Sequence, residues 1–295
     1  MRTTSWKAAA LAVAATGALA LAGCGDDDDE GGGAAATTAT TSKAVDYDVS
    51  LRVTERRGKG RYVAPQTLDA GLARISLANT GDNAHEAQLI RVDGDHTAAE
   101  VKRVIEADDG KIPGWLHAAG GPGTTAPGGE STVTVVLEPG QHYVVDSSDS
   151  DAEAEPFPIE VTGEPVDAQL PGVPATITAS DFEFVTSGLK AGLNQVRFEN
   201  TGRELHHALA FPLAKGATIA QARTFFQSQE EPEGKPPVDF SGGTGTTVLD
   251  GGKAQVVEMD LEAGSYALVC FITNRAGGPP HVAMGMISEL KIPRP

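Results

Sequence analysis

Four residues near the C-terminus carry side chains that bind soft metal ions. Cys270 ends an apolar run, His281 follows eleven positions later, and Met284 and Met286 come soon after it. Thiolate, imidazole and thioether are the ligand types of trigonal copper sites, in which two His and one Cys surround the ion and a Met lies at a longer distance. The stretch 267–287 therefore predicts part of a copper site, and the second His must come from elsewhere in the chain.

The number of cysteines supports a metal-binding role for Cys270. The chain has 2 Cys, which are Cys24 and Cys270. If Cys24 carries another modification, Cys270 has no partner for an intramolecular disulfide. A single thiol in an exported protein is either a small buried apolar residue or a metal ligand. The neighbouring His and Met residues favour the ligand.

The N-terminus indicates export and a lipid anchor. Arg2 and Lys7 accompany an apolar run of 14 residues, Ala8 to Leu21. This pattern is typical of a secretion signal, and the run is too short to span a bilayer, which needs about 20 residues. The run ends in Leu21-Ala22-Gly23-Cys24, which resembles the lipobox of bacterial lipoproteins. We therefore expect a signal peptide over residues 1–23, lipidation of Cys24, and an extracytoplasmic protein anchored to the cell membrane by its lipid.

The segment after the lipobox and the net charge bear on partners. Residues 24–43 contain five consecutive acidic residues and then small and polar ones, so we expect a disordered tether. The chain has a formal charge of −17, and removal of the two basic residues of the signal leaves 21 basic against 40 acidic residues, or −19. This excess excludes nucleic acid as a natural partner, because phosphate contacts require a basic surface. It favours a basic redox protein as partner.

The rest of the chain contains an internal repeat. The motif Asn-Thr-Gly-x3-His occurs at residues 79–85 and again at 200–206, an offset of 121 from His85 to His206. Two further pairs of segments repeat in the same order, with offsets of 121 and 124: Leu68–Leu72 with Leu189–Leu193, and Leu137–Gly140 with Leu261–Gly264. We therefore predict a tandem duplication, with domain 1 over residues 44–164 and domain 2 over residues 165–295.

Each copy has the pattern of a β-sandwich with one helix. Alternating apolar and polar residues over 195–199 and 257–261 predict half-buried strands, and turn residues separate the strands at spacings typical of a sandwich. The segments 97–100 and 218–221 fit the capping box that begins a helix. Apolar stripes behind each box predict one amphipathic helix per copy. The predicted fold class is all-β, with two tandem sandwiches and one short helix in each.

The second copy resembles a cupredoxin, the Greek-key sandwich of plastocyanins, azurins and the type 1 domain of copper nitrite reductases. The likeness lies in the order of features: Asn-x-Gly-x3-His after a strand, then Cys at a strand end, then His and Met on the next loop. It implies two Greek-key cupredoxin-like sandwiches, with one type 1 copper in domain 2. Carried over to this sequence, the implied metal ligands are His206, Cys270, His281 and Met286. The ten residues between Cys270 and His281 make this loop longer than in the small blue proteins.

The first ligand has a neighbour of the same type. His206 and His207 are adjacent, and side chains on a strand alternate between two faces, so only one of them points inward. In the first copy, His85 shares a face with Ala87 and Leu89. The pattern therefore favours His206, the equivalent of His85, over His207.

The axial ligand poses a similar choice. Its spacing from His281 and the preceding Gly285 favour Met286, which leaves Met284 as packing at the rim of the loop. The resemblance also implies a supporting residue: Asn200, in the turn before His206, is expected to hold the ligand loop.

The first copy lacks most of these donors. Asp146 or Ser147 stands where Cys270 would align, and the following loop has carboxylates but no His, Cys or Met. We expect domain 1 to bind no redox metal and to serve a structural or docking role, with His85 left as a core or rim histidine without a partner. Three more histidines are expected on the surface: His96, His117 and His142.

These features predict a one-electron carrier. Thiolate and thioether suit Cu(I), imidazole suits both oxidation states, and a geometry between the two preferences lets copper change charge with little rearrangement. The sequence has no His-x-His pair and 7 His in total, which is too few for the additional copper centres of multicopper oxidases or nitrite reductases, so we expect no enzymatic activity. Two alternatives are a copper storage or delivery protein with the same ligands, and a copper-free sandwich that binds protein or cell wall.

Overall fold

The computed structural model describes residues 46–107, 109–148, 153–228 and 234–294. The predicted signal peptide, the lipidation site Cys24 and the predicted tether lie outside these residues. Within the described ranges the chain forms seventeen strands and two short helices. Neither helix in these ranges is long and apolar enough to cross a membrane. The predicted all-β class is confirmed.

The first half of the chain carries nine strands and the helix α1. In chain order they are β1 (Tyr47–Glu55), β2 (Gly60–Val63), β3 (Thr67–Asp69), β4 (Gly71–Asn79), β5 (Gln88–Val92), α1 (Ala98–Ile105), β6 (Leu116–Ala118), β7 (Glu130–Leu137), β8 (Gly140–Val145) and β9 (Phe157–Thr162).

The second half carries eight strands and the helix α2. In chain order they are β10 (Ala175–Ser180), β11 (Glu183–Ser187), β12 (Gly192–Asn200), β13 (Leu209–Pro212), α2 (Ile219–Gln227), β14 (Thr244–Gly245), β15 (Ala254–Leu261), β16 (Gly264–Val269) and β17 (Ile287–Ile292). One helix per half agrees with the prediction.

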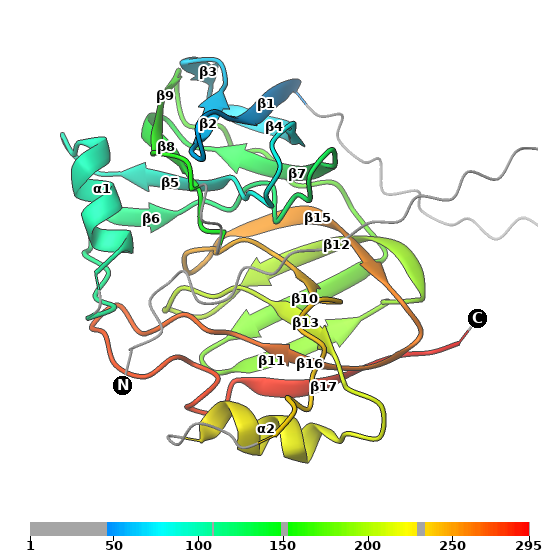
Figure 1. The fold of residues 1–295 in the computed structure, drawn as a ribbon. Helices are drawn as coiled ribbons and strands as arrows, with labels where there is room; N and C mark the ends of the chain where they lie inside the picture. Colours follow the sequence, from blue (N-terminus) through cyan, green and yellow to red (C-terminus); the bar gives the residue numbers. More distant parts are fainter. Residues whose placement is uncertain (1–45, 108, 149–152, 229–233, 295) are drawn as a thin grey trace, which may run out of the picture.

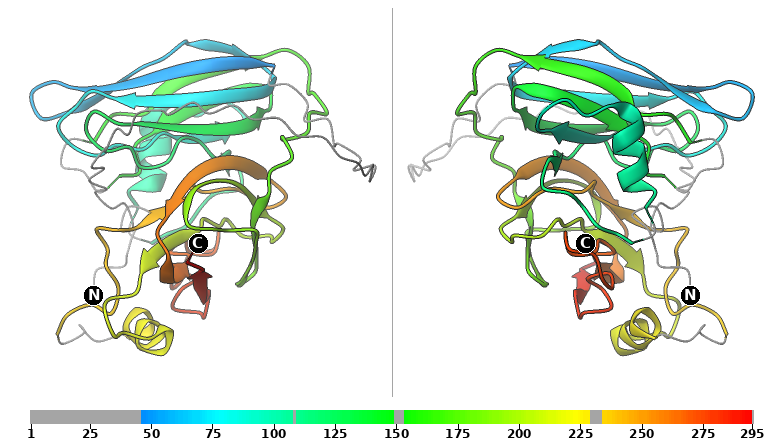
Figure 2. Two further views of the ribbon diagram at one scale, coloured as in Figure 1. Left: turned by 90° about the vertical axis from the view of Figure 1, so that its right-hand side faces the viewer. Right: turned by 90° about the vertical axis from the view of Figure 1, so that its left-hand side faces the viewer.

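One sheet runs through both halves. Its eight strands have the order β11-β10-β12-β15-β7-β4-β1-β2. Each half adds a sheet of its own, which is β3-β9-β8-β5-β6 in the first half and β14-β13-β16-β17 in the second. Figure 1 shows the first half above the second, with β7 and β15 where the halves meet, and Figure 2 shows the same division from two other sides.

The halves are joined by backbone pairing, a buried amide and a shared core. Strands β7 and β15 pair antiparallel, with Val133 opposite Val257. The fully buried Gln88 side chain crosses the junction, donating to the Val248 oxygen at 3.1 Å and accepting from the Val248 nitrogen at 2.7 Å. A single apolar cluster contains core residues of both halves. The predicted boundary between residues 164 and 165 falls between β9 and β10 and stays a prediction.

The local sequence patterns explain these elements. On β12, Val196 and Phe198 are fully buried, whereas the neighbouring Gln195 is exposed, as the alternation predicts. Both capping boxes are present: the side chains of Thr97 and Thr218 accept from the backbone of the residue three positions on, whose own side chain bonds back. The helix and strand predictions for these segments are confirmed.

Candidate metal centre

Three predicted ligands meet at one end of the second half. Cys270 directly follows β16, His281 lies in the loop before β17, and His206 lies between β12 and β13. The pairing of β16 with both β13 and β17 brings these segments side by side. All three side chains are 0% exposed. Their ligand atoms lie within 4.8 Å of one another, and they form the one such group of three His, Cys, Asp or Glu among the described residues.

The three donor atoms form a triangle of the size that one metal ion requires. The sulfur of Cys270 lies 3.7 Å from Nδ1 of His206 and 3.5 Å from Nδ1 of His281, and the two nitrogens are 3.1 Å apart. An ion at the centre, about 2.0 Å from each nitrogen and about 2.3 Å from the sulfur, needs spacings of roughly 3.5 to 3.7 Å. The observed spacings are close to these values, so the residues fit a single ion.

Each imidazole is oriented by a hydrogen bond from its other nitrogen. Nε2 of His206 lies 3.0 Å from an Asp181 carboxylate oxygen, and Nε2 of His281 lies 3.1 Å from Oδ1 of Asn274. Both partners are acceptors, so each Nε2 carries the proton and each Nδ1 presents a lone pair to the triangle. This is the tautomer that a metal-binding imidazole needs.

Burial sets the protonation of the metal-free site. It lowers the pKa of His206, partly opposed by Asp181. Burial and the charge of His206 lower the pKa of His281 to about 3, and burial raises the pKa of Cys270 to about 12. At neutral pH the site therefore contains two neutral imidazoles and one thiol. A single S–H proton can satisfy one Nδ1 lone pair, so the other faces its neighbour without a donor. The donor set fits a soft cation bound to a thiolate.

Met286 and Met284 occupy different environments. Met286 is 0% exposed, whereas Met284 is 37% exposed. The backbone of Met286 is tied to both neighbouring ligands, since its oxygen accepts from Cys270 at 3.4 Å and its nitrogen donates to His281 at 2.9 Å. The structure thus buries Met286 and ties its backbone to two of the ligand residues, whereas Met284 lies at the surface. The choice of Met286 as axial ligand stays a prediction.

His207 lies outside the triangle. Its Nε2 accepts a hydrogen bond from the Phe271 nitrogen at 2.9 Å, and its ring packs edge-on against the Phe271 ring. Burial lowers the pKa of His207 to about 3. His206, the histidine favoured from the repeat, is therefore the one that faces Cys270.

Asn200 supports the segment that carries His206. Its amide nitrogen donates to the Glu204 oxygen at 2.8 Å and to the Leu249 oxygen at 2.9 Å. Leu249 in turn forms a backbone bridge with His206. The predicted supporting role of Asn200 agrees with these contacts.

The equivalent position in the first half contains a carboxylate instead of a thiol. Asp146 follows β8 as Cys270 follows β16, and its Oδ2 lies 2.6 Å from Nδ1 of His85. The other ring nitrogen of His85 lies 3.2 Å from a Glu55 oxygen. The prediction that His85 lacks a partner was wrong, because Glu55 comes from a strand end thirty residues earlier and no local pattern marks it.

Of the three histidines expected at the surface, one is buried and two are half-buried. His142 is 1% exposed, and burial lowers its pKa to about 4. That prediction was wrong because β8 lies in the middle of its sheet and is buried from His142 to Val145. His96 is half-buried and stacks on Trp115. His117 is also half-buried and lies between the carboxylates of Asp93 and Asp250.

Sequence reasoning missed the residues that orient the two imidazoles. Asp181 and Asn274 hold His206 and His281, and the Phe182 ring packs edge-on against His281 with centroids 4.8 Å apart. Asp181 directly follows β10, and Glu55 is the last residue of β1. Each carboxylate bonds to the repeated histidine of its own half. The offset from Glu55 to Asp181 is 126 and differs from the 121 of the repeated histidine, so the equivalence becomes visible only in the strand pairing.

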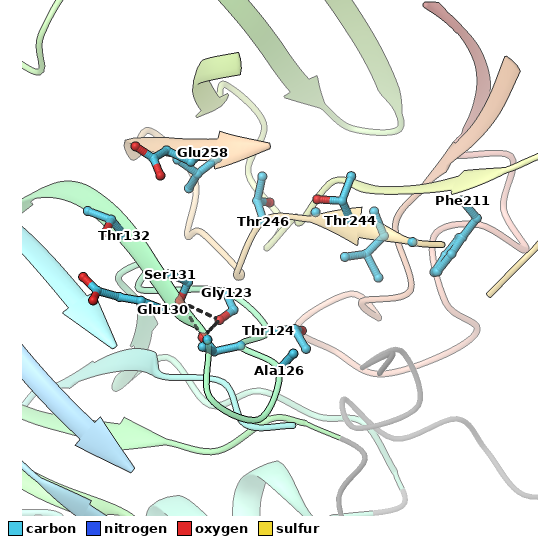
Figure 3. A pocket seen from close by; sticks show the side chains of 16 residues that line it. Gly123, Thr124, Ala126, Glu130, Ser131, Thr132, Phe211, Thr244, Thr246 and Glu258 are labelled. Carbon is cyan, nitrogen blue, oxygen red and sulfur yellow. Dashed lines mark hydrogen bonds between the residues drawn. The ribbon is translucent and has the colours of Figure 1, made fainter. Parts of the chain in front are cut away.

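A groove between the halves is separate from the triangle. It has a volume of about 220 Å³ and is lined mainly by small and hydroxyl-bearing residues of segments 123–132 and 243–246. Figure 3 shows these side chains, including Ser131, which donates to the Gly123 oxygen at 3.1 Å. None of the predicted ligands lines the groove.

Comparisons with solved structures return cupredoxin-fold proteins. A multicopper oxidase is 14% identical, with 83% of this chain and 88% of that chain covered and a TM-score of 0.24. The copper nitrite reductase from Nitrosomonas europaea is 14% identical, with 84% and 94% covered and a TM-score of 0.25. An auracyanin from Roseiflexus castenholzii is 16% identical, with 41% and 100% covered and a TM-score of 0.28. The sequence matches no family model and no curated protein.

Proposed function

We propose that this protein is a one-electron carrier with a type 1 copper centre in its second half. The proposed ligands are His206, Cys270 and His281, with Met286 as the axial ligand. The observation that carries the proposal is the buried triangle of two imidazole lone pairs and one thiol, whose spacings fit one ion. When bound, copper would supply reversible one-electron redox chemistry.

The protein's own residues would keep the rearrangement small. Asp181 and Asn274 hold the two imidazoles in the metal-binding tautomer. Full burial of the three side chains keeps water out of the triangle. Because the thiol is protonated at neutral pH in the metal-free chain, Cys270 must release its proton when metal binds.

The cellular setting is part of the same proposal. We infer an extracytoplasmic protein anchored to the cell membrane through lipid on Cys24, with no enzymatic activity of its own. The net charge, −19 after removal of the signal, favours a basic redox protein as partner, and the association rate would then fall as ionic strength rises.

The first experiment is a visible absorption spectrum of residues 25–295 after addition of Cu(II) and removal of the excess. We expect an intense thiolate-to-copper band that disappears in Cys270→Ser and in His206→Gln. His207→Gln is the matched control and should keep the band, because His207 lies outside the triangle.

Thiol modification, Cu(I) affinity and redox cycling, measured beside this spectrum, distinguish the other functions. No band in the wild-type chain, with Cys270 inert to thiol reagents while folded, would contradict the proposal and favour a copper-free binding protein. Tight Cu(I) binding without reversible oxidation would favour storage or delivery.

A further inference from the structure

The long loop between Cys270 and His281 is attached to the first half of the chain. The Thr273 hydroxyl donates to the Gly110 oxygen at 2.7 Å, and the Ile112 nitrogen donates to the Arg275 oxygen at 2.9 Å. Beside these bonds, Ile272 is 2% exposed and belongs to the apolar cluster that also contains Ile112. The ten residues that lengthen this loop therefore make contacts across the junction.

Arg275 makes the most extensive of these contacts. Its Nη1 donates to the oxygens of Pro113 and Leu116, each at 3.1 Å, and both belong to the first half. Its Nη2 donates to an Asp250 carboxylate oxygen at 2.6 Å. Its backbone nitrogen donates to a Glu204 carboxylate oxygen at 2.7 Å. One side chain thus ties the ligand loop to two carbonyl groups of the first half and to a carboxylate of the second.

The segment that supports His206 is attached to the same part of the first half. Leu249 exchanges backbone hydrogen bonds with His206 at 2.8 and 3.0 Å. On its other side Leu249 bridges to Ala119, and the Asp250 nitrogen donates to the Ala118 oxygen at 2.8 Å. Both ligand-carrying segments therefore rest on residues 110–121.

We propose that residues 110–121 of the first half form a fixed seat for the metal ligands of the second half, and that Arg275 is the positioning residue that locks the Cys270–His281 loop onto this seat. The inference rests on the proposed function. On this inference, the first half serves to hold the two ligand-carrying segments in place. Two ligands keep their spacing only if the loops on which they lie do not move independently. Arg suits this position, since its planar guanidinium group can donate hydrogen bonds to several acceptors at once.

The test is Arg275→Ala, with Arg197→Ala as the matched control. Arg197 pairs with Glu199 on β12, and this ion pair lies within the second half. In the metal-free chain we expect amide exchange over residues 271–282 and modification of Cys270 by a thiol reagent to become about tenfold faster in Arg275→Ala. The control should match the wild type in both measurements.

The copper-loaded protein gives a second readout that a merely structural role would not change. We expect Arg275→Ala to bind Cu(II) about tenfold more weakly and to show a shifted thiolate-to-copper band, while urea unfolding confirms a folded chain. Thr273→Val, which removes only the bond to Gly110, should change exchange and band in the same direction and serves if Arg275→Ala does not fold.

The outcomes separate this inference from the proposed function. If wild-type protein binds no copper but Arg275→Ala still accelerates exchange and thiol modification, the seat stands and the electron-carrier proposal fails. If wild-type protein binds copper while both variants keep wild-type exchange, thiol reactivity and band, the seat is overturned and the copper centre stands.

Discussion

Met284 and Met286 allow the role of the axial ligand to be tested at the level of single residues. Met286→Leu removes a thioether from a fully buried position, and Met284→Leu makes the same change at a side chain that is 37% exposed. We expect Met286→Leu to keep the copper band and raise the reduction potential. An apolar side chain near copper disfavours the more highly charged Cu(II).

The rise should be about 60 mV or more, which is a tenfold change in the Cu(II)-to-Cu(I) affinity ratio for a one-electron couple. A potentiometric titration followed at the copper band measures it. Met284→Leu should have the wild-type potential. Equal potentials in all three proteins would remove Met286 from the ligand set.

His85 in the first half occupies the position of His206. The residues around it favour protonation of its imidazole over binding of a metal ion. Burial alone lowers its pKa, but the hydrogen bonds and charges of Asp146 and Glu55 outweigh burial and raise the pKa of His85. Asp146 also accepts hydrogen bonds from the backbone of Glu86, Ser148 and Ala154. The protonated imidazole, when it forms, therefore has a carboxylate acceptor at each ring nitrogen.

These contacts predict a pH dependence of stability. A histidine whose pKa is raised by folding stabilises the protein fully below its unfolded pKa of about 6.5, and this contribution is lost as the pH rises through the folded value. We expect His85→Gln to lower the free energy of unfolding by about 3 kcal/mol at pH 6, and by progressively less above pH 6.5. Urea unfolding of the metal-free chain from pH 6 to 9 measures this difference.

His142→Gln provides a control of opposite sign. Burial lowers the pKa of His142 to about 4, so the wild-type histidine contributes less stability below about pH 6.5, where the unfolded chain takes up a proton. The effect of His142→Gln should therefore not decrease above pH 6.5. A pH-independent effect of His85→Gln would show that folding does not raise the pKa of His85.

At the level of strands and helices, local patterns predicted much of the fold. The capping boxes marked both helix starts, and the alternation in β12 and β15 marked their buried faces. Cys270 could be placed at a strand end because an apolar run stops there, and the repeat of His85 and His206 identified the facing histidine. Each of these signals lies within a few residues of the feature that it predicts.

Features that depend on pairing between distant segments were not predictable in this way. The pairing of β7 with β15 joins residues more than one hundred positions apart, and neither strand carries a signal that names its partner. The same holds for the contacts of Arg275 with the backbone oxygens of Pro113 and Leu116, since carbonyl acceptors have no sequence signature. The length of the Cys270–His281 loop could be read from the sequence, but its contacts with the first half depend on the three-dimensional pairing.

The whole molecule has the construction of a single cooperative unit. The shared sheet, the buried Gln88 side chain and one apolar cluster connect the halves. Opening the junction would expose apolar side chains and break the hydrogen bonds between Gln88 and Val248, each of which contributes about 0.5 to 1.5 kcal/mol. Separate unfolding of one half is therefore unfavourable.

We predict a single thermal transition for the described chain, and that Cu(II) shifts this transition as a whole. A ligand that binds only the native state stabilises everything that unfolds with its site, by about 2.7 kcal/mol at one hundred times the dissociation constant. Differential scanning calorimetry should give equal calorimetric and van't Hoff enthalpies with and without metal. Gln88→Leu, which leaves the Val248 nitrogen without its acceptor, should weaken the coupling and separate the transitions of the two halves. Two transitions in the wild-type chain, with only one responding to Cu(II), would mean that the halves are independent and that the shared sheet does not couple them.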